Sequence, residues 1–205
     1  MGGEPLLHPE CKEFFKITRK YFPQSAIWLV TNGILLPKQK EDFWEYAKKY
    51  KIEIHPTKYP IKVDWESVEA MCEKYEIPLI FYNNTRVEKT LFQLLLDREG
   101  KQDAFDSFTH CHQANCCVRF HKGKLYTCTV AASIEHLNKK FNQNFPTSPN
   151  DYIDIHKTTS FAEISNFLAR PIPFCKYCKV YEWKSIGKWK TSSKTLEEYT
   201  QKYEE

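Results

Sequence analysis

The stretch Cys111–Cys128, which reads CHQANCCVRFHKGKLYTC, decides the architecture of this chain together with the later segment Phe174–Cys178, FCKYC. Eleven residues separate Cys111 from Gly123, and four more separate Gly123 from Cys128. Six of the chain's eight cysteines lie between the first and the last of these positions. Four thiolates from two separated segments make the ligand set of a tetrahedral zinc site or of an iron–sulfur cluster. The pattern therefore predicts a metal site and leaves the metal open.

The predicted ligands are four thiols: Cys111, Cys128, Cys175 and Cys178. The two-residue gap in the distal pair lets both sulfurs face one ion. Cys116 or Cys117 is an alternative to Cys111, and a set of buried free thiols is the alternative to a metal site. The nearby histidines are left out of the ligand list. A Gly123-Lys124 turn between apolar segments predicts a β-hairpin with Cys128 on its returning strand.

Composition bounds the class of protein. The chain has 205 residues, of which 41% are hydrophobic and 15% aromatic, which is enough for a packed core. Its 30 basic and 26 acidic residues give a net charge of only +4, so the balance does not favour a nucleic-acid partner. No apolar run approaches the roughly 20 residues of a membrane span, and no signal peptide is recognisable. Metal-like cysteine spacing in a lysine-rich chain favours a reduced, cytoplasmic setting over a disulfide scaffold.

Helix and strand patterns alternate through the first hundred residues. The expected helices lie at about 11–22, 40–50, 64–75 and 88–98, and the expected strands at 26–30, 52–56 and 78–82. The strand at 26–30 is a continuous apolar run, which is typical of a strand buried on both faces. Alternation of this kind predicts parallel βα units. Such units carry functional loops at the carboxyl ends of their strands, where Thr31 and Asn32 lie.

After residue 105 the pattern changes to short strands, turns and cysteines. Ser160 and Glu163 form a capping box that opens a helix with Phe161 and Phe167 among its inward residues. A charged tail follows, and it is expected to form a solvated helix. The predicted organisation has three parts: residues 1–104, 105–182 and 183–205.

The amino-terminal motif carries a resemblance to a known family. Gly2-Gly3-Glu4-Pro5, followed by a helix and by a strand that ends at Thr31-Asn32-Gly33, resembles the middle of the core of radical S-adenosylmethionine (radical SAM) enzymes. In that family the glycine turn binds the methionine amino group of the cofactor. The resemblance therefore implies that Gly2, Gly3 and Glu4 bind S-adenosylmethionine, with Thr31 and Asn32 near the same face.

The cysteine pattern is similar to the auxiliary-cluster extensions of that family, called SPASM and twitch domains. The single distal pair favours the shorter twitch type with one [4Fe–4S] cluster, and the spacing to Gly123 favours Cys111 as its first ligand. The implied fold is α/β: a partial (β/α) barrel that lacks its first two strands, followed by a small cysteine-rich α+β domain.

The departure from the family is the missing Cys-x3-Cys-x2-Cys motif, which holds the cluster that cleaves S-adenosylmethionine. We therefore expect a truncated enzyme, or one completed by another polypeptide, and assign no catalytic residue to these 205 positions. A complete enzyme would make a 5′-deoxyadenosyl radical and abstract hydrogen from a peptide, sugar or small metabolite, with an electron donor as partner. By themselves these residues are not expected to catalyse the reaction.

The rival interpretation is a zinc-stabilised module that binds RNA or another protein. The same four thiolates would hold Zn²⁺, and aromatic and basic residues of the tail, such as Trp183 and Lys188, would contact the partner. A [4Fe–4S] cluster with S-adenosylmethionine in a longer protein, or zinc alone, are thus the two predicted cofactor sets.

Overall fold

The computed structural model describes residues 3–81, 90–114, 116–158 and 160–200. They form two compact units. The amino-terminal unit contains the residues up to Leu91 and the short segment Lys188–Lys190, and the cysteine-rich unit contains Phe92–Gly187 and the residues that follow Lys190. Both mix helices with small sheets, and the part of the chain described here contains no closed barrel. The α/β class is confirmed at this level.

The amino-terminal unit is built around two parallel strands. Its helices and strands, in chain order, are α1 (Cys11–Tyr21), β1 (Ile27–Thr31), α2 (Glu41–Lys49), β2 (Ile52–Pro56) and α3 (Trp65–Lys74). β1 pairs with β2 so that Leu29 lies opposite Ile54. On the other side of β2, Ile54 forms a parallel bridge with Leu79, closed by hydrogen bonds of 2.8 and 2.9 Å. The described part of the expected third strand is therefore present as a bridge.

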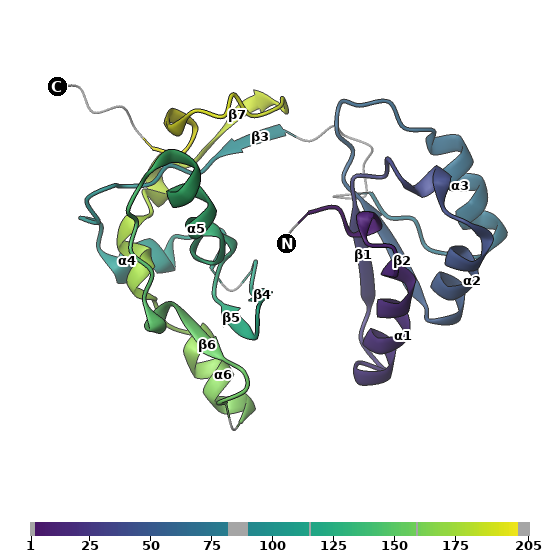
Figure 1. Ribbon diagram of the computed structural model, residues 1–205, viewed down its shortest axis with the longest axis horizontal. Coiled ribbons are helices and arrows are strands. Elements are labelled where there is room, and N and C mark those ends of the chain that lie inside the picture. Colours follow the sequence, from purple (N-terminus) through teal and green to yellow (C-terminus); the bar gives the residue numbers. More distant parts are fainter. Residues whose placement is uncertain (1–2, 82–89, 115, 159, 201–205) are drawn as a thin grey trace. The chain divides into compact units, whose positions relative to one another are not determined.

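The three helices pack on one face of these strands (Figure 1). Leu29 and Ile54 point into a core with Phe43, Trp44 and Val68 from the helices. The opposite face is open: Trp28 is 60% exposed and Val30 is 41% exposed. Trp28 stacks there on the His55 ring at a centroid distance of 4.3 Å. The expectation that this strand is buried on both faces is wrong, since an apolar run does not report whether one or two layers cover it.

The cysteine-rich unit contains an antiparallel sheet and three helices. Its elements are α4 (Ala104–Thr109), β4 (Arg119–His121), β5 (Lys124–Tyr126), α5 (Thr129–Phe141), β6 (Tyr152–Asp154) and α6 (Phe161–Leu168). The strand order is β4-β5-β6. Lys122 and Gly123, both at positive φ, form the two-residue turn between β4 and β5. The predicted hairpin is confirmed, but its turn lies one residue earlier than the expected Gly123-Lys124, because Lys124 already pairs in β5. Cys128 was expected on the returning strand, but it lies two residues beyond β5, at the N-cap of α5, because the strand ends at Tyr126.

Ser160 caps α6 as predicted, because its hydroxyl accepts a 3.2 Å hydrogen bond from the Glu163 amide. Phe167 is buried, but Phe161 is 81% exposed and not inward-facing. The first helical position of a short helix projects past the core, so the apolar stripe begins one turn later than its sequence suggests.

Two helix predictions are wrong. Residues Thr90–Gln93 form strand β3, in place of a helix over 88–98, and Lys184–Lys188 form strand β7, in place of a helical tail. β3 and β7 pair with each other. The Leu95 carbonyl accepts hydrogen bonds from Lys179 and from the buried Trp183 indole. Pairing with distant segments thus overrides the helix propensity of the leucines.

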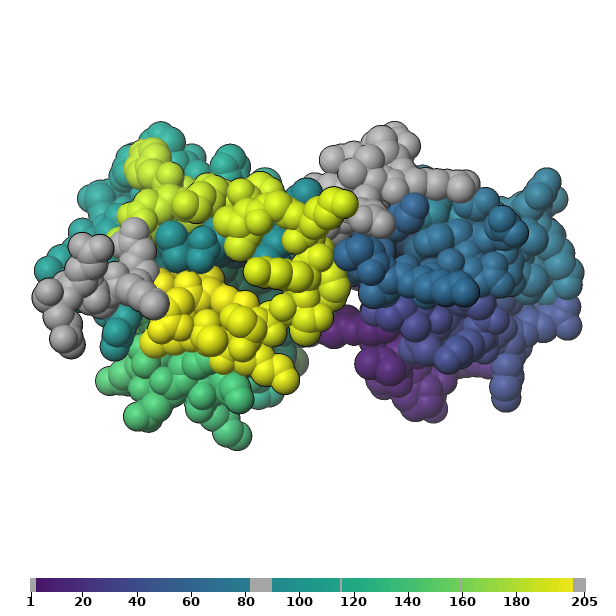
Figure 2. Space-filling view, turned by 90° about the horizontal axis from the view of Figure 1, so that it is seen from above, coloured from purple at the N-terminus to yellow at the C-terminus, as the bar shows by residue number. Residues whose placement is uncertain are grey.

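The C-terminal segment returns to the cysteine-rich unit, where Figure 2 shows it in yellow against green and teal residues. Leu96 donates to the Tyr199 carbonyl at 2.8 Å and bridges both Cys178 and Thr200. Leu95 and Leu96 belong to the core of this unit, so its packing begins well before the change of sequence pattern at residue 105. No helix among the described residues is long and apolar enough to cross a membrane.

Candidate functional site

The four predicted ligands come together in one core. Cys128 and Cys178 are buried in the hydrophobic cluster of the cysteine-rich unit, and Cys111 and Cys175 pack against it from partly buried positions. The surrounding side chains are apolar and include Ile134 and Phe174. Sequence positions 67 residues apart therefore contribute thiols to a single desolvated region.

The charges of these thiols act on one another. Burial, the largest cause, together with the charge of Cys111 raises the pKa of Cys128 to about 11. Burial likewise raises the pKa of Cys175 to about 11, with added contributions from Cys128 and Cys111. The pKa of Cys178 is raised well above its usual value by burial first and then by the other three thiols. Mutual repulsion of this kind occurs only between groups that lie near each other, and a bound cation would reverse it.

Backbone amides are directed at two of the sulfurs. The amides of Gln113 and Ala114 each donate to the Cys111 sulfur at 3.3 Å. The amides of Val130 and Ala131, at the start of α5, lower the pKa of Cys128 against the effect of burial. In both cases the donors follow the cysteine by two and three residues, so the same local turn serves each sulfur. N–H groups and a helix N-terminus stabilise a thiolate, which is the form that binds metal.

A buried carboxylate positions the second cysteine segment. Asp151 accepts hydrogen bonds from the amides of Ser148 at 2.7 Å and Phe174 at 2.8 Å. The second bond ties the short 3-10 helix Pro173–Tyr177, which carries Cys175, to the start of β6. Burial raises the pKa of Asp151, and its charge in turn raises the pKa of Cys128 and Cys175. Asp151 was not among the predicted site residues, and the Ser-x-x-Asp spacing of a capping box is the sequence signal that could have identified it.

The side chains of the four predicted ligands are not arranged around a common metal position. Within the described ranges no group of three or more histidine, cysteine, aspartate or glutamate side chains is arranged to hold a metal ion. All eight cysteines are free thiols. The donor set fits a metal in chemistry, since four soft ligands share one buried region, but binding requires the thiols to turn toward a common centre. Which of the predicted ligands bind a metal stays a prediction.

Cys116 and Cys117 lie in the loop between Cys111 and β4. Cys116 is exposed and Cys117 is partly buried. The Cys117 amide donates to the Gln113 carbonyl at 3.0 Å. It is Cys111 whose charge acts on the three other predicted ligands. Cys111 also packs against the hydrophobic cluster that holds the other three thiols, so it is favoured over its two neighbours as the fourth thiol.

The second predicted site lies at the carboxyl end of β1. Glu4 Oε1 accepts hydrogen bonds from the Thr31 hydroxyl at 2.6 Å and from the Leu6 amide at 3.2 Å. Its Oε2 accepts from the Asn32 amide at 2.8 Å. Three of the predicted residues, Glu4, Thr31 and Asn32, are thus brought together. Gly3 is exposed, with no atom within 4 Å of the position that a Cβ would occupy, and Gly2 lies outside the described residues.

Glu4 retains capacity for a ligand. A carboxylate offers about four lone-pair positions, of which Leu6, Thr31 and Asn32 occupy three. The remaining acceptor position belongs to Oε2. A single ammonium donor could therefore bind there without breaking the internal contacts. Glu4 also raises the pKa of the Cys11 thiol, after burial, which places that cysteine beside the same turn.

The hydrogen bonds of Glu4 give a first testable prediction. In Glu4→Gln the amide can still accept from Thr31, but its NH2 group cannot accept from the Asn32 amide, so one donor loses its partner. We expect a loss of about 1–3 kcal/mol in the free energy of unfolding, measured by urea titration. Glu10→Gln, an exposed position without a side-chain cap, is the matched control and should change stability by less than about 0.5 kcal/mol. Equal effects at both positions would show that the Glu4 contacts are not formed in solution.

Cys72 is buried in the core of the amino-terminal unit, and Cys11 packs against that core from a partly buried position. Burial raises the pKa of Cys72 to about 12. Trp183, which the rival interpretation assigns to a partner-binding tail, is buried instead. No protein-family model matches this chain, and a search of curated proteins finds no match either.

Proposed function

We propose that the cysteine-rich unit holds one [4Fe–4S] cluster on Cys111, Cys128, Cys175 and Cys178. The observation that carries the proposal is the meeting of these four thiols, from two distant segments, in or against one buried hydrophobic cluster. Burying several uncompensated thiolates is unfavourable, whereas a cluster of net positive charge would stabilise all of them together. The bound cluster would supply a site for electron uptake or for substrate coordination.

We further propose that the amino-terminal unit belongs to a partial (β/α) barrel of the radical SAM type. Two features support this. The helices α1, α2 and α3 cover one face of the parallel strands and leave the other open, as the wall of a barrel does and a doubly wound sheet does not. The spare acceptor position on Glu4 lies at the carboxyl ends of the strands, where ligands of such sheets bind.

In this proposal the residues have distinct tasks. Glu4 accepts a hydrogen bond from the amino group of S-adenosylmethionine, while Thr31 and Asn32 fix the orientation of its carboxylate. The four thiolates bind the auxiliary cluster, and Asp151 holds the segment of Cys175 in place. Cleavage of S-adenosylmethionine would need a second cluster, whose Cys-x3-Cys-x2-Cys ligands are not among these 205 residues. Hydrogen abstraction from a peptide or small metabolite is therefore proposed only for a protein that contains them.

The alternative is a zinc site on the same thiols in a binding module. The N–H donors at Cys111 and Cys128 favour a thiolate centre of either kind. The aromatic tail residues are less available to a partner than the sequence suggested. Trp183 is buried, and Trp189 packs edge-on against Tyr59 at a ring-centroid distance of 4.9 Å. The zinc-module alternative is therefore supported only by the proposed metal site, and not by a partner-binding surface.

Metal analysis of protein purified without oxygen decides between the two. The proposal predicts about four irons and four sulfides per chain with broad absorption near ~400 nm, as thiolate-bound clusters show. One colourless zinc per chain would replace it by the binding module. A chain with neither metal, before and after anaerobic reconstitution with iron and sulfide, would overturn both assignments.

A further inference from the structure

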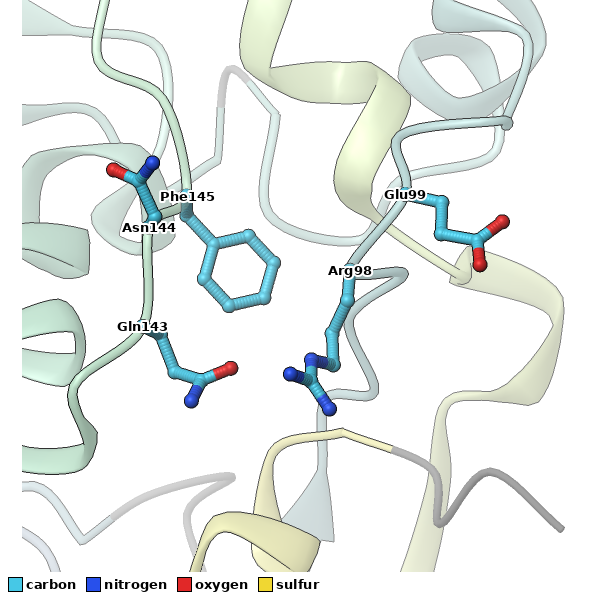
Figure 3. Close-up of a pocket in the computed structure, with 5 residues that line it drawn as sticks. All are labelled: Arg98, Glu99, Gln143, Asn144 and Phe145. Carbon is cyan, nitrogen blue, oxygen red and sulfur yellow. The ribbon is translucent and has the colours of Figure 1, made fainter. Parts of the chain in front are cut away.

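A hollow of about 430 Å³ in the cysteine-rich unit is engaged by contacts within the chain. Its described lining consists of Arg98, Glu99, Gln143, Asn144 and Phe145 (Figure 3). Arg98 already interacts within the chain. The Gln143 side chain donates to the Phe141 carbonyl at 2.9 Å, and the Phe145 amide and carbonyl both bond to the Asn138 side chain. A surface that is apolar and exposed lies instead on α1 of the amino-terminal unit.

The helix α1 exposes an apolar stripe on one side. Phe14 is 52% exposed, Ile17 is 50% exposed and Tyr21 is 67% exposed. Their spacing of three and four residues aligns them along the helix axis. Phe15, which follows Phe14 and projects about 100° away from it, is buried in the core of the unit. The helix therefore buries one apolar side and presents a second one to solvent, which marks an interaction surface.

Two charged residues border this stripe on the flank that lies away from Phe15. Glu13 and Lys20 directly precede Phe14 and Tyr21 in the sequence. A separation of seven residues places both on the same side of the helix, about two turns apart. The Lys20 ammonium lies 5.3 Å from the centroid of the Tyr21 ring, so it is beside the stripe. The flank thus carries a negative charge toward the amino end of α1 and a positive charge toward its carboxyl end.

We propose that a second copy of this chain covers the stripe, with the two α1 helices antiparallel about a twofold axis. When Phe14 of one copy lies opposite Ile17 of the other, the symmetry repeats the same contact with the copies exchanged. The charged flanks of the two helices then lie side by side, as in antiparallel coiled coils, and Glu13 of each copy faces Lys20 of the other. Two ion pairs therefore border one apolar centre.

The charges select this register over the alternatives. A shift that sets Ile17 opposite Tyr21 of the second copy would bring the two Lys20 side chains together. A parallel pair of helices would place Glu13 beside Thr18, which carries no charge. The antiparallel pair with Phe14 opposite Ile17 is the arrangement in which opposite charges meet and like charges do not, which is how charged flanks specify one pairing.

The dimer is expected to be weak and reversible. The helix α1 has 11 residues, so its stripe is smaller than the roughly 800 Å² per partner that stable complexes bury. We expect a dissociation constant of roughly 1–100 µM. The contact uses no residue of the cysteine-rich unit, so the inference is independent of the proposed iron–sulfur function.

Sedimentation velocity of the full chain from about 1 to about 500 µM measures this equilibrium. Reductant prevents disulfide-linked dimers through the exposed Cys116. The parent chain should change from monomer to dimer over this range. Glu13→Lys and Lys20→Glu should each weaken the dimer by at least about tenfold, because both ion pairs become like-charge contacts. The double variant, Glu13→Lys with Lys20→Glu, should return to within about threefold of the parent affinity, since its ion pairs are restored in reverse.

A mixture and a control variant sharpen the test. The two single variants, mixed in equal amounts, should form a mixed dimer, because each supplies the charge that the other lacks. Lys16→Glu is the matched control: it lies on α1, is exposed and makes the same change of charge as Lys20→Glu, but it projects away from the stripe and should leave the affinity unchanged. Ile17→Asp, at an exposed position, should abolish the dimer. Circular dichroism verifies that each variant folds.

Four results would each overturn the inference. The first is a parent chain that stays monomeric up to about 500 µM, which would leave the stripe to a different partner. The second is a dimer that both single charge reversals leave intact, which would place the interface elsewhere. The third is loss of the dimer in both single variants without recovery in the double variant or in the mixture. The fourth is equal weakening by Lys16→Glu and Lys20→Glu, which would show an effect of net charge alone.

Discussion

Replacement of Cys128 by serine is expected to reduce the bound metal to less than about a tenth of the amount in the parent chain. Cys128 is buried, it starts α5, and it acts on the charges of Cys175 and Cys178. Serine cannot form a thiolate and binds soft metals poorly. Because a structural site gains much of its free energy from the complete ligand set, the loss of one ligand should empty it. Iron, zinc and sulfide content of the purified variant gives the answer.

The choice of serine separates ligation from folding. Serine is among the best N-cap residues, so the start of α5 should be at least as stable in Cys128→Ser as in the parent chain. Cys116→Ser and Cys117→Ser are the matched controls from the neighbouring loop, and both should keep their metal. Full metal content in Cys128→Ser would remove this residue from the site. Loss of metal in Cys117→Ser with retention in Cys111→Ser would move the fourth ligand to the alternative that the sequence left open.

Local signals in the sequence were reliable where the contact or the backbone conformation that they indicate involves only a few neighbouring residues. Gly123 sits at positive φ in the hairpin turn, and Ser160 accepts a hydrogen bond from the Glu163 amide at the start of α6. Each of these contacts lies within a few residues along the chain. Capping and turn chemistry therefore predicted these element boundaries and the hairpin before Cys128.

Features that depend on distant partners were not predictable in this way. The leucines after Thr90 have helix propensity, yet Leu95 and Leu96 pair with Lys179, Trp183 and Tyr199, more than 80 residues later. The open face of β1 depends on which side the helices cover, which the run Ile27–Val30 does not encode. The gathering of the four thiols was inferred from spacing, but the anchoring role of Asp151 became visible only when Phe174 was placed beside it.

Metal-free protein is expected to lose stability steeply as the pH rises from about 9 to 11. The usual thiol pKa is 9.0, and burial raises the pKa of Cys128 and Cys175 to about 11 and that of Cys178 well above its usual value. Below pH 9 these thiols are protonated in both the folded and the unfolded chain, so stability does not depend on them. Between pH 9 and 11 the unfolded chain releases its protons first, which favours unfolding. A shift of two pKa units corresponds to roughly 3 kcal/mol per thiol at the end of this range.

Urea titrations at several pH values measure this effect, and they should be made in a Cys72→Ser background, since the pKa of that buried thiol is also raised, to about 12. Adding Cys128→Ser should then decrease the slope of unfolding free energy against pH by about one proton. Bound metal removes this loss of stability at alkaline pH. In the loaded protein the thiols have already lost their protons, so the alkaline loss should disappear, and metal affinity should rise with pH below 9 because binding releases those protons. A metal-free chain whose stability is flat up to pH 11 would mean that these thiols are solvated, and a buried four-thiolate centre would then have no basis in this fold.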